Sequence, residues 1–262
     1  MKSKSMRLGA FAAAILAAGI GFIFLFARQT PAQGTELVVV VSDGMKPSVE
    51  ELVPQMEHAI GRKIMAQYNS SKNIREKIQS GEAFDVAILT TDIIDDLIKQ
   101  GKIAAGTRAE IARTGMGVGV RAGAPKPDVS TPEALKRVLV SAKSISFNPS
   151  GASAPHVYDI FEHLGITDSV KPKLMLDPEA GRPQMNVADG KCDLVITLIP
   201  EIKFFKGVEL AGPVPADLQS YINFGAGVAS NTKNADAGKA LIKYITSPAA
   251  APVLKAKALE PR

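Results

Sequence analysis

Strand-like and helix-like patterns alternate along residues 63–101, which read KIMAQYNSSKNIREKIQSGEAFDVAILTTDIIDDLIKQG. Residues 63–68 predict a strand, and residues 70–81 predict a helix with apolar positions at helical spacing and a terminal glycine. Residues 86–89 are apolar on both faces, as a buried parallel strand is. Residues 92–98 predict a second helix, capped by its first aspartate.

The residues before this stretch form one more unit of the same kind. Residues 37–41 read LVVVV and predict a buried strand, and residues 47–60 predict a helix that Gly61 ends. Three strand–helix units in a row predict a parallel sheet covered by helices. The fold class expected from the sequence is therefore α/β.

The second half of the chain repeats this pattern. Strands are predicted at residues 144–147, 173–176 and 194–198, and helices at residues 157–164 and 179–189. The chain is therefore expected to form two lobes, each with its own sheet.

Two glycine-containing segments, residues 114–121 and 221–229, are predicted to cross between the lobes. Glycine at strand positions where another backbone comes close is the alternative interpretation. Two crossings mean that the C-terminal segment completes the first lobe. The predicted division is residues 33–116 with 224–262 as lobe 1, and residues 117–223 as lobe 2.

The N-terminus has the composition of an export signal. Three basic residues, Lys2, Lys4 and Arg7, precede an uncharged apolar run over residues 8–27, and small residues surround Ala32. This order predicts a secretory signal peptide over residues 1–32, cleaved after Ala32. An uncleaved membrane anchor is the alternative, because about 20 apolar residues can span a bilayer.

The charge of the remaining chain argues against nucleic acid as a partner. Four of the 31 Lys and Arg residues lie in the first 32 positions, so the rest carries 27 basic against 26 acidic residues. Tryptophan is absent and aromatic residues make up 5% of the chain, which leaves little for base stacking.

Catalytic and cofactor motifs are missing from the sequence. The three histidines show no metal-ligand spacing, and the single cysteine, Cys192, precedes an apolar run and is expected to be a buried thiol. No Gly-x-Ser-x-Gly motif occurs, and the glycines of residues 115–119 lack the strand–turn–helix pattern of a nucleotide site. We therefore expect a protein that is not an enzyme and that carries no cofactor or metal cation.

Hydroxyl side chains recur at the predicted strand-to-helix junctions. In open α/β sheets ligands bind at the carboxyl ends of strands, where helix N-termini attract anions. Each serine alone is typical of a helix cap, but several such junctions facing one cleft predict an anion site. Asp43 would repel an anion there, and Lys72 could compensate. The junction residues are Ser42, Ser70, Ser71, Ser150, Ser153 and Thr197.

Four segments resemble the periplasmic molybdate-binding proteins of ABC importers. These are residues 37–57, residues 68–88 (YNSSKNIREKIQSGEAFDVAI), residues 97–103 (LIKQGKI) and residues 189–195 (DGKCDLV). The resemblance implies a two-lobed type II periplasmic binding fold that closes on a small oxyanion and delivers it to a membrane permease. It also implies a monomeric protein in the periplasm.

The resemblance further implies which residues hold the ligand. Ser42 and Ser71, with Ser70 adjacent, would contribute from the first lobe. The second lobe would contribute from Ser150 to Ser153 and around Gly181, while Thr197 stands where the family usually places a tyrosine. Molybdate or tungstate is the expected ligand, with another small anion such as a carboxylate as the alternative. A membrane-anchored sensor or partner-binding module with the same fold is a second alternative.

Overall fold

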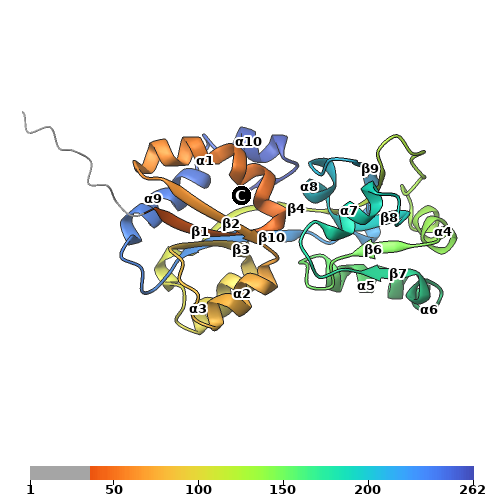
Figure 1. The fold of residues 1–262 in the computed structure, drawn as a ribbon, viewed down its shortest axis with the longest axis horizontal. Helices are drawn as coiled ribbons and strands as arrows, with labels where there is room; N and C mark the ends of the chain where they lie inside the picture. Colours follow the sequence, from red (N-terminus) through yellow and green to blue (C-terminus); the bar gives the residue numbers. More distant parts are fainter. Residues whose placement is uncertain (1–35) are drawn as a thin grey trace, which may run out of the picture. The chain divides into compact units, whose positions relative to one another are not determined.

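The computed structural model describes residues 36–262, and the expected signal peptide lies outside the described residues. Within these residues the chain forms two mixed sheets, each covered by helices (Figure 1). The six-stranded sheet has the order β11-β4-β10-β3-β1-β2, and the five-stranded sheet has the order β7-β6-β8-β5-β9. The predicted α/β class and the two lobes are confirmed.

The first lobe begins with the three predicted strand–helix units. Strand β1 pairs in parallel with β2 on one side and β3 on the other, which places the ends of all three at one edge of the sheet. The elements are β1 (Leu37–Ser42), η1 (Asp43–Met45), α1 (Lys46–Ile60), β2 (Ile64–Asn69), α2 (Ser71–Gln79), β3 (Val86–Thr90) and α3 (Thr91–Lys99).

The second lobe is built around β6, which pairs in parallel with β7 and β8. Strand β5 pairs antiparallel with both β8 and β9. The elements are β5 (Met116–Arg121), α4 (Pro132–Ser141), β6 (Ile145–Phe147), α5 (Ala154–His163), α6 (Thr167–Val170), η3 (Lys171–Lys173), β7 (Leu174–Leu176), α7 (Arg182–Ala188), β8 (Leu194–Leu198), α8 (Ile199–Lys203) and β9 (Val208–Pro213).

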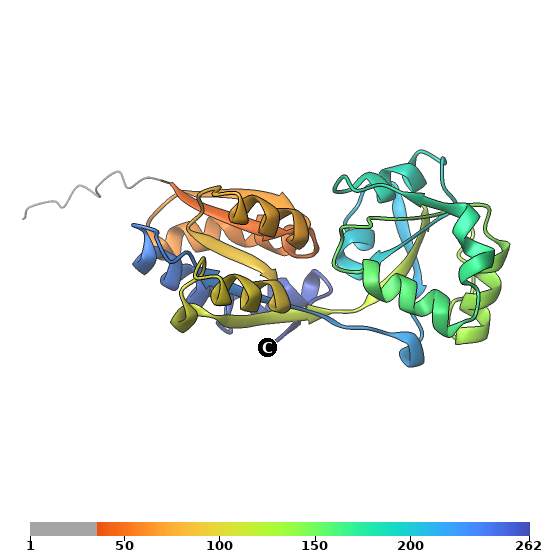
Figure 2. The same cartoon turned by 90° about the horizontal axis from the view of Figure 1, so that it is seen from below.

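The chain passes between the lobes twice (Figure 2). Gly115 alone separates β4 of the first sheet from β5 of the second, and the chain returns between β9 and β10. The remaining elements belong to the first lobe or the return: η2 (Ala105–Thr107), β4 (Ala109–Thr114), η4 (Ala216–Leu218), β10 (Ile222–Val228), α9 (Ala235–Ile245), α10 (Ala251–Ala256) and β11 (Glu260–Pro261). The exact lobe boundaries given above stay a prediction.

Burial agrees with the expected role of the cysteine. Cys192 is 4% exposed, as predicted for a structural thiol, and burial raises its pKa.

Among residues 36–262, no group of acidic, histidine and cysteine side chains has the arrangement of a metal site. The helices of this same part of the chain are too short or too polar to cross a bilayer.

One side chain ties the two connections between the lobes together. Gln219 accepts a hydrogen bond from the Met116 backbone N–H at 2.7 Å and donates its amide to the carbonyls of Met116 at 3.0 Å and Val214 at 3.1 Å. A Cβ at Gly115 would lie 3.0 Å from the same amide, so the glycine leaves room for it. The crossings are thus held by a side chain as well as by strand pairing.

Replacing Gln219 by leucine should lower the free energy of unfolding by about 1–3 kcal/mol, because the Met116 N–H loses its acceptor in a buried position. Urea denaturation measures the loss. Gln67→Leu is the matched control, since that glutamine is exposed on β2. Equal stability of the two variants would mean that strand pairing alone holds the crossings.

Candidate functional site

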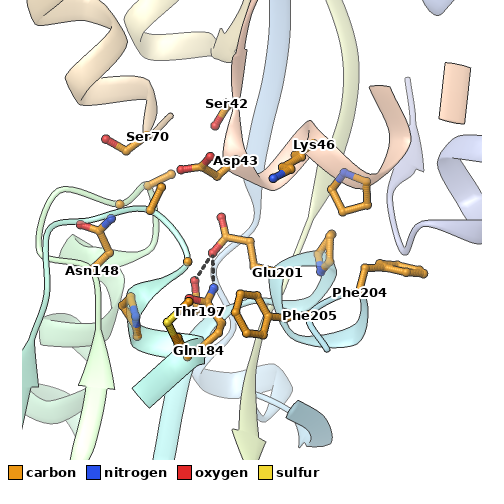
Figure 3. A pocket seen from close by; sticks show the side chains of 18 of the residues that line it. Ser42, Asp43, Lys46, Ser70, Asn148, Gln184, Thr197, Glu201, Phe204 and Phe205 are labelled. Atoms are coloured by element: carbon orange, nitrogen blue, oxygen red, sulfur yellow. Dashed lines mark hydrogen bonds between the residues drawn. The ribbon is translucent and has the colours of Figure 1, made fainter. Parts of the chain in front are cut away.

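A cavity of about 470 Å³ lies at the carboxyl ends of β1, β2 and β8 (Figure 3). This is where open α/β sheets bind ligands, and the volume suits a small molecule. Both lobes contribute polar side chains, and prolines and aromatic rings complete the wall. The polar residues are Ser42, Asp43, Lys46, Glu50, Ser70, Asn148, Gln184, Thr197, Glu201 and Lys257.

Two carboxyl groups enter this cavity from different lobes. Asp43 begins η1, directly after β1, and Glu201 lies on α8, directly after β8. Figure 3 shows both side chains in the cavity, with the Glu201 carboxyl directed toward Asp43. The sequence did not predict an acidic pair. It indicated only that Asp43 would repel an anion at the site.

Neighbouring side chains orient the Glu201 carboxyl. Its Oε2 accepts a short hydrogen bond from the Thr197 hydroxyl and a longer one, 3.5 Å, from the Gln184 amide nitrogen. The Ser153 hydroxyl lies 3.4 Å from the Thr197 oxygen, and because Thr197 donates to Glu201, Ser153 is the donor to Thr197. This chain of hydroxyls engages one carboxylate oxygen and leaves Oε1 available to a ligand.

The environment raises the pKa of both Asp43 and Glu201. Burial raises the pKa of Glu201 to about 7, the Thr197 hydrogen bond opposes this, and the charge of Asp43 adds to it. Burial also raises the pKa of Asp43 to about 6, although the Lys46 charge lowers it. Near neutral pH the cavity therefore holds an ionised carboxylate beside a carboxyl group that is partly protonated.

The hydroxyl groups of the first lobe face the same cavity. Ser42 is 3% exposed and lines it, and Ser70, the N-cap of α2, lines it as well. The Ser70 oxygen accepts from the Asn73 N–H at 3.2 Å, so its proton remains available for a ligand. Lys46 lies beside them, with a long contact of 3.9 Å to Glu50.

The seven predicted ligand residues divide into three groups. Ser42, Ser70, Gly181 and Thr197 line the cavity with the acids.

Ser71 and Ser150, together with Lys72, line a second cavity of about 490 Å³, and the Ser71 oxygen accepts from the Thr90 N–H at 3.2 Å. Ser153 is buried behind Thr197. Gly151 and Ala152 border both cavities, so the two adjoin.

Sequence reasoning missed Glu201 and Gln184. Gln184 is 5% exposed, and its Oε1 has no hydrogen-bond partner among the described residues. The spacing of Thr197 and Glu201, four residues apart at a strand-to-helix junction, was the available signal. It is weak without the structure, because α8 has five residues and shows no clear periodicity.

The raised pKa of Glu201 has a consequence for stability. The unfolded chain loses this proton near pH 4.5 and the folded chain near pH 7, so the free energy of unfolding falls as the pH rises between these values. Each unit of difference between the folded and unfolded pKa changes the free energy of unfolding by about 1.4 kcal/mol. Asp43 acts in the same direction but over a lower range, up to about pH 6.

Glu201→Gln should therefore flatten the decline in stability between pH 6 and 7, measured by urea denaturation of ligand-free protein across this range. Glu162→Gln, an exposed change on α5, should keep the wild-type decline. An unchanged profile in Glu201→Gln would show that Glu201 titrates normally.

Comparison with known proteins identifies the family of this chain. The family model of bacterial extracellular solute-binding proteins matches residues 37–258. Aconitate isomerase of a Pseudomonas species is 26% identical over 232 residues, which cover 87% of this chain and 88% of that protein. The molybdate-binding protein ModA of Azotobacter vinelandii is 26% identical over 231 residues, which cover 86% and 90%.

Solved structures show the same fold at lower identity. The periplasmic molybdate-binding protein of Azotobacter vinelandii aligns with a TM-score of 0.72 and 20% identity, over 86% of this chain and 98% of that one. The sulfate-binding protein SubI of Mycobacterium tuberculosis aligns with a TM-score of 0.70 and 18% identity, over 87% of each chain. The predicted type II periplasmic binding fold is confirmed, and the chain belongs to the family of bacterial extracellular solute-binding proteins.

Proposed function

We propose that this protein is exported by residues 1–32, captures a small organic carboxylate in the cavity between its lobes, and presents it to an ABC-type permease. The family membership and the position of the cavity support a binding role. A ligand that touches both lobes favours their closed arrangement, which a permease can recognise. A membrane-retained sensor with the same site is the alternative if residues 1–32 stay attached.

The choice between ligand classes depends on the acidic pair, Asp43 and Glu201. A tetrahedral dianion held by Ser42 and Ser70 would lie beside the carboxyl of Asp43 in the same cavity. Two unit charges 4 Å apart repel by about 4 kcal/mol at the effective dielectric constant of such sites. This cost applies to each unit of charge, so it is smaller for a carboxylate, which brings one charge to the serines, than for an inorganic dianion with both charges on one centre.

An organic acid fits the cavity better than an inorganic anion does, because it can contact both the serines, Ser42 and Ser70, and Glu201. Its carboxylate can accept from the hydroxyls of Ser42 and Ser70, while a hydroxyl or second carboxyl group exchanges a hydrogen bond with Glu201. Its carbon skeleton finds apolar wall at Phe204 and Phe205. The two relatives support both ligand classes, since one is named for aconitate and the other for molybdate.

A thermal-unfolding panel on the exported, purified protein tests the ligand class. The panel holds molybdate, tungstate, sulfate, phosphate, and di- and tricarboxylates that include cis- and trans-aconitate. A carboxylate at about 100 times its dissociation constant should add about 2.7 kcal/mol of stability and raise the unfolding midpoint. A shift with molybdate and tungstate alone would return the site to the oxyanion expectation, and no shift would reject a small anion.

Ser42→Ala should weaken binding of the stabilising carboxylate by about 1–3 kcal/mol, because a buried donor at the anion end is lost. Isothermal titration calorimetry measures the change. Ser80→Ala at the far end of α2 is the control, since that hydroxyl is exposed and bonds to the Lys77 carbonyl. Unchanged affinity in Ser42→Ala, with the fold intact, would remove this residue from the site.

A further inference from the structure

We infer that Glu201 and Asp43 catalyse a proton shift on the bound carboxylate, so that the protein moves the double bond of a small unsaturated di- or tricarboxylate. The inference rests on the proposed function, because the substrate is the carboxylate that the cavity binds. It departs from the expectation that the protein is not an enzyme, which followed from the missing catalytic motifs in the sequence.

The first argument is the fixed position of Glu201. A general acid or base must be held within hydrogen-bond reach of the atom with which it exchanges a proton. Here Thr197 and Gln184 bond to the same oxygen, Oε2, and Ser153 bonds to Thr197 from behind. The carboxyl is therefore oriented by three side chains while its other oxygen is left for the cavity (Figure 3).

The second argument is the presence of two acids in different surroundings. Asp43 lies near the Lys46 charge, which favours its ionised form, whereas Glu201 is bonded to neutral groups. Two carboxyls whose environments separate their titrations can divide the two roles, and here Asp43, with the lower pKa, is the base and Glu201 the acid. Their raised pKa values, about 6 and about 7, place both roles near neutral pH.

The third argument is the set of hydroxyl groups that line the same cavity from the first lobe. Removing a proton from a carbon activated by a carboxylate pushes negative charge onto the carboxylate oxygens. Donors already aimed at those oxygens stabilise that charge. Ser42 and Ser70 offer hydroxyl donors there, and Lys46 adds a positive charge.

The step balances without any co-reactant. A carboxylate of the pair takes a proton from the saturated carbon next to the double bond, and that C–H electron pair forms the new double bond. The old double-bond electrons form a C–H bond at the far carbon with a proton from a carboxyl of the pair. Substrate and product are isomers, and neither oxidation nor reduction occurs.

Solvent deuterium makes the step visible. Wild-type protein is incubated with cis- or trans-aconitate in deuterium oxide, and proton NMR follows loss of the allylic signals and formation of the other isomer. General acid–base catalysis contributes about 10²–10⁴-fold, so Glu201→Gln should lower the exchange rate by that factor. Glu162→Gln, exposed on α5, should keep the wild-type rate.

The same samples are tested for binding by thermal unfolding, so that the two proposals can fail separately. Binding without exchange in the wild type would overturn the catalytic role and leave the binding role. Full exchange in Glu201→Gln would overturn the role of Glu201 as the acid. Absence of any binding would overturn both.

A pH profile separates proton transfer from a merely structural effect. The Thr197 hydrogen bond lowers the pKa of Glu201, so Thr197→Val should raise it and move the basic limb of the rate profile, which reports the acid, to higher pH. An unmoved basic limb would contradict Glu201 as the titrating acid. The charged groups that line the cavity with Glu201 are Asp43, Lys46, Glu50 and Lys257, all of which the variant retains.

Discussion

The close approach of the first turn, η1, to the end of β8 fixes the chemistry of the cavity. At Gly44 a Cβ atom would lie 2.6 Å from the Leu198 side chain and 2.7 Å from the Phe224 ring, so a larger residue would push these side chains aside. Asp43 precedes that glycine, and Glu201 follows Leu198 by three residues. One packing contact therefore brings two carboxyl groups from different lobes into one space, and their shared burial raises both pKa values.

Burial of these acids would be costly if both were ionised and unsupported. The structure reduces the cost for Glu201 with donors from Thr197 and Gln184, and for Asp43 with the nearby Lys46 charge. The remaining penalty is relieved by protonation, which is why the pair titrates near neutral pH. A site that needed only to hold a dianion would not need this arrangement, since hydroxyls and helix N-termini suffice for that task.

The sequence predicted those features that depend on local pattern. The buried run of β1 and the amphipathic α2 follow from residue spacing, and the hydroxyls of Ser42 and Ser70 follow from their place after strands. Short or polar elements such as α8 and β9 carry no clear period and were missed. The pairing of Asp43 with Glu201 depends on contact between residues 158 positions apart, which no local pattern encodes.

Anion binding and protonation of the acidic pair are linked. A carboxylate ligand placed near Asp43 raises the cost of ionising both acids, so the bound protein holds its protons more tightly than the free protein does. In the proposed closed arrangement, removal of water from the cavity would strengthen this coupling. The retained proton serves both proposed roles. It allows Glu201 to donate a hydrogen bond to a bound anion, and it is also the proton that a double-bond shift requires.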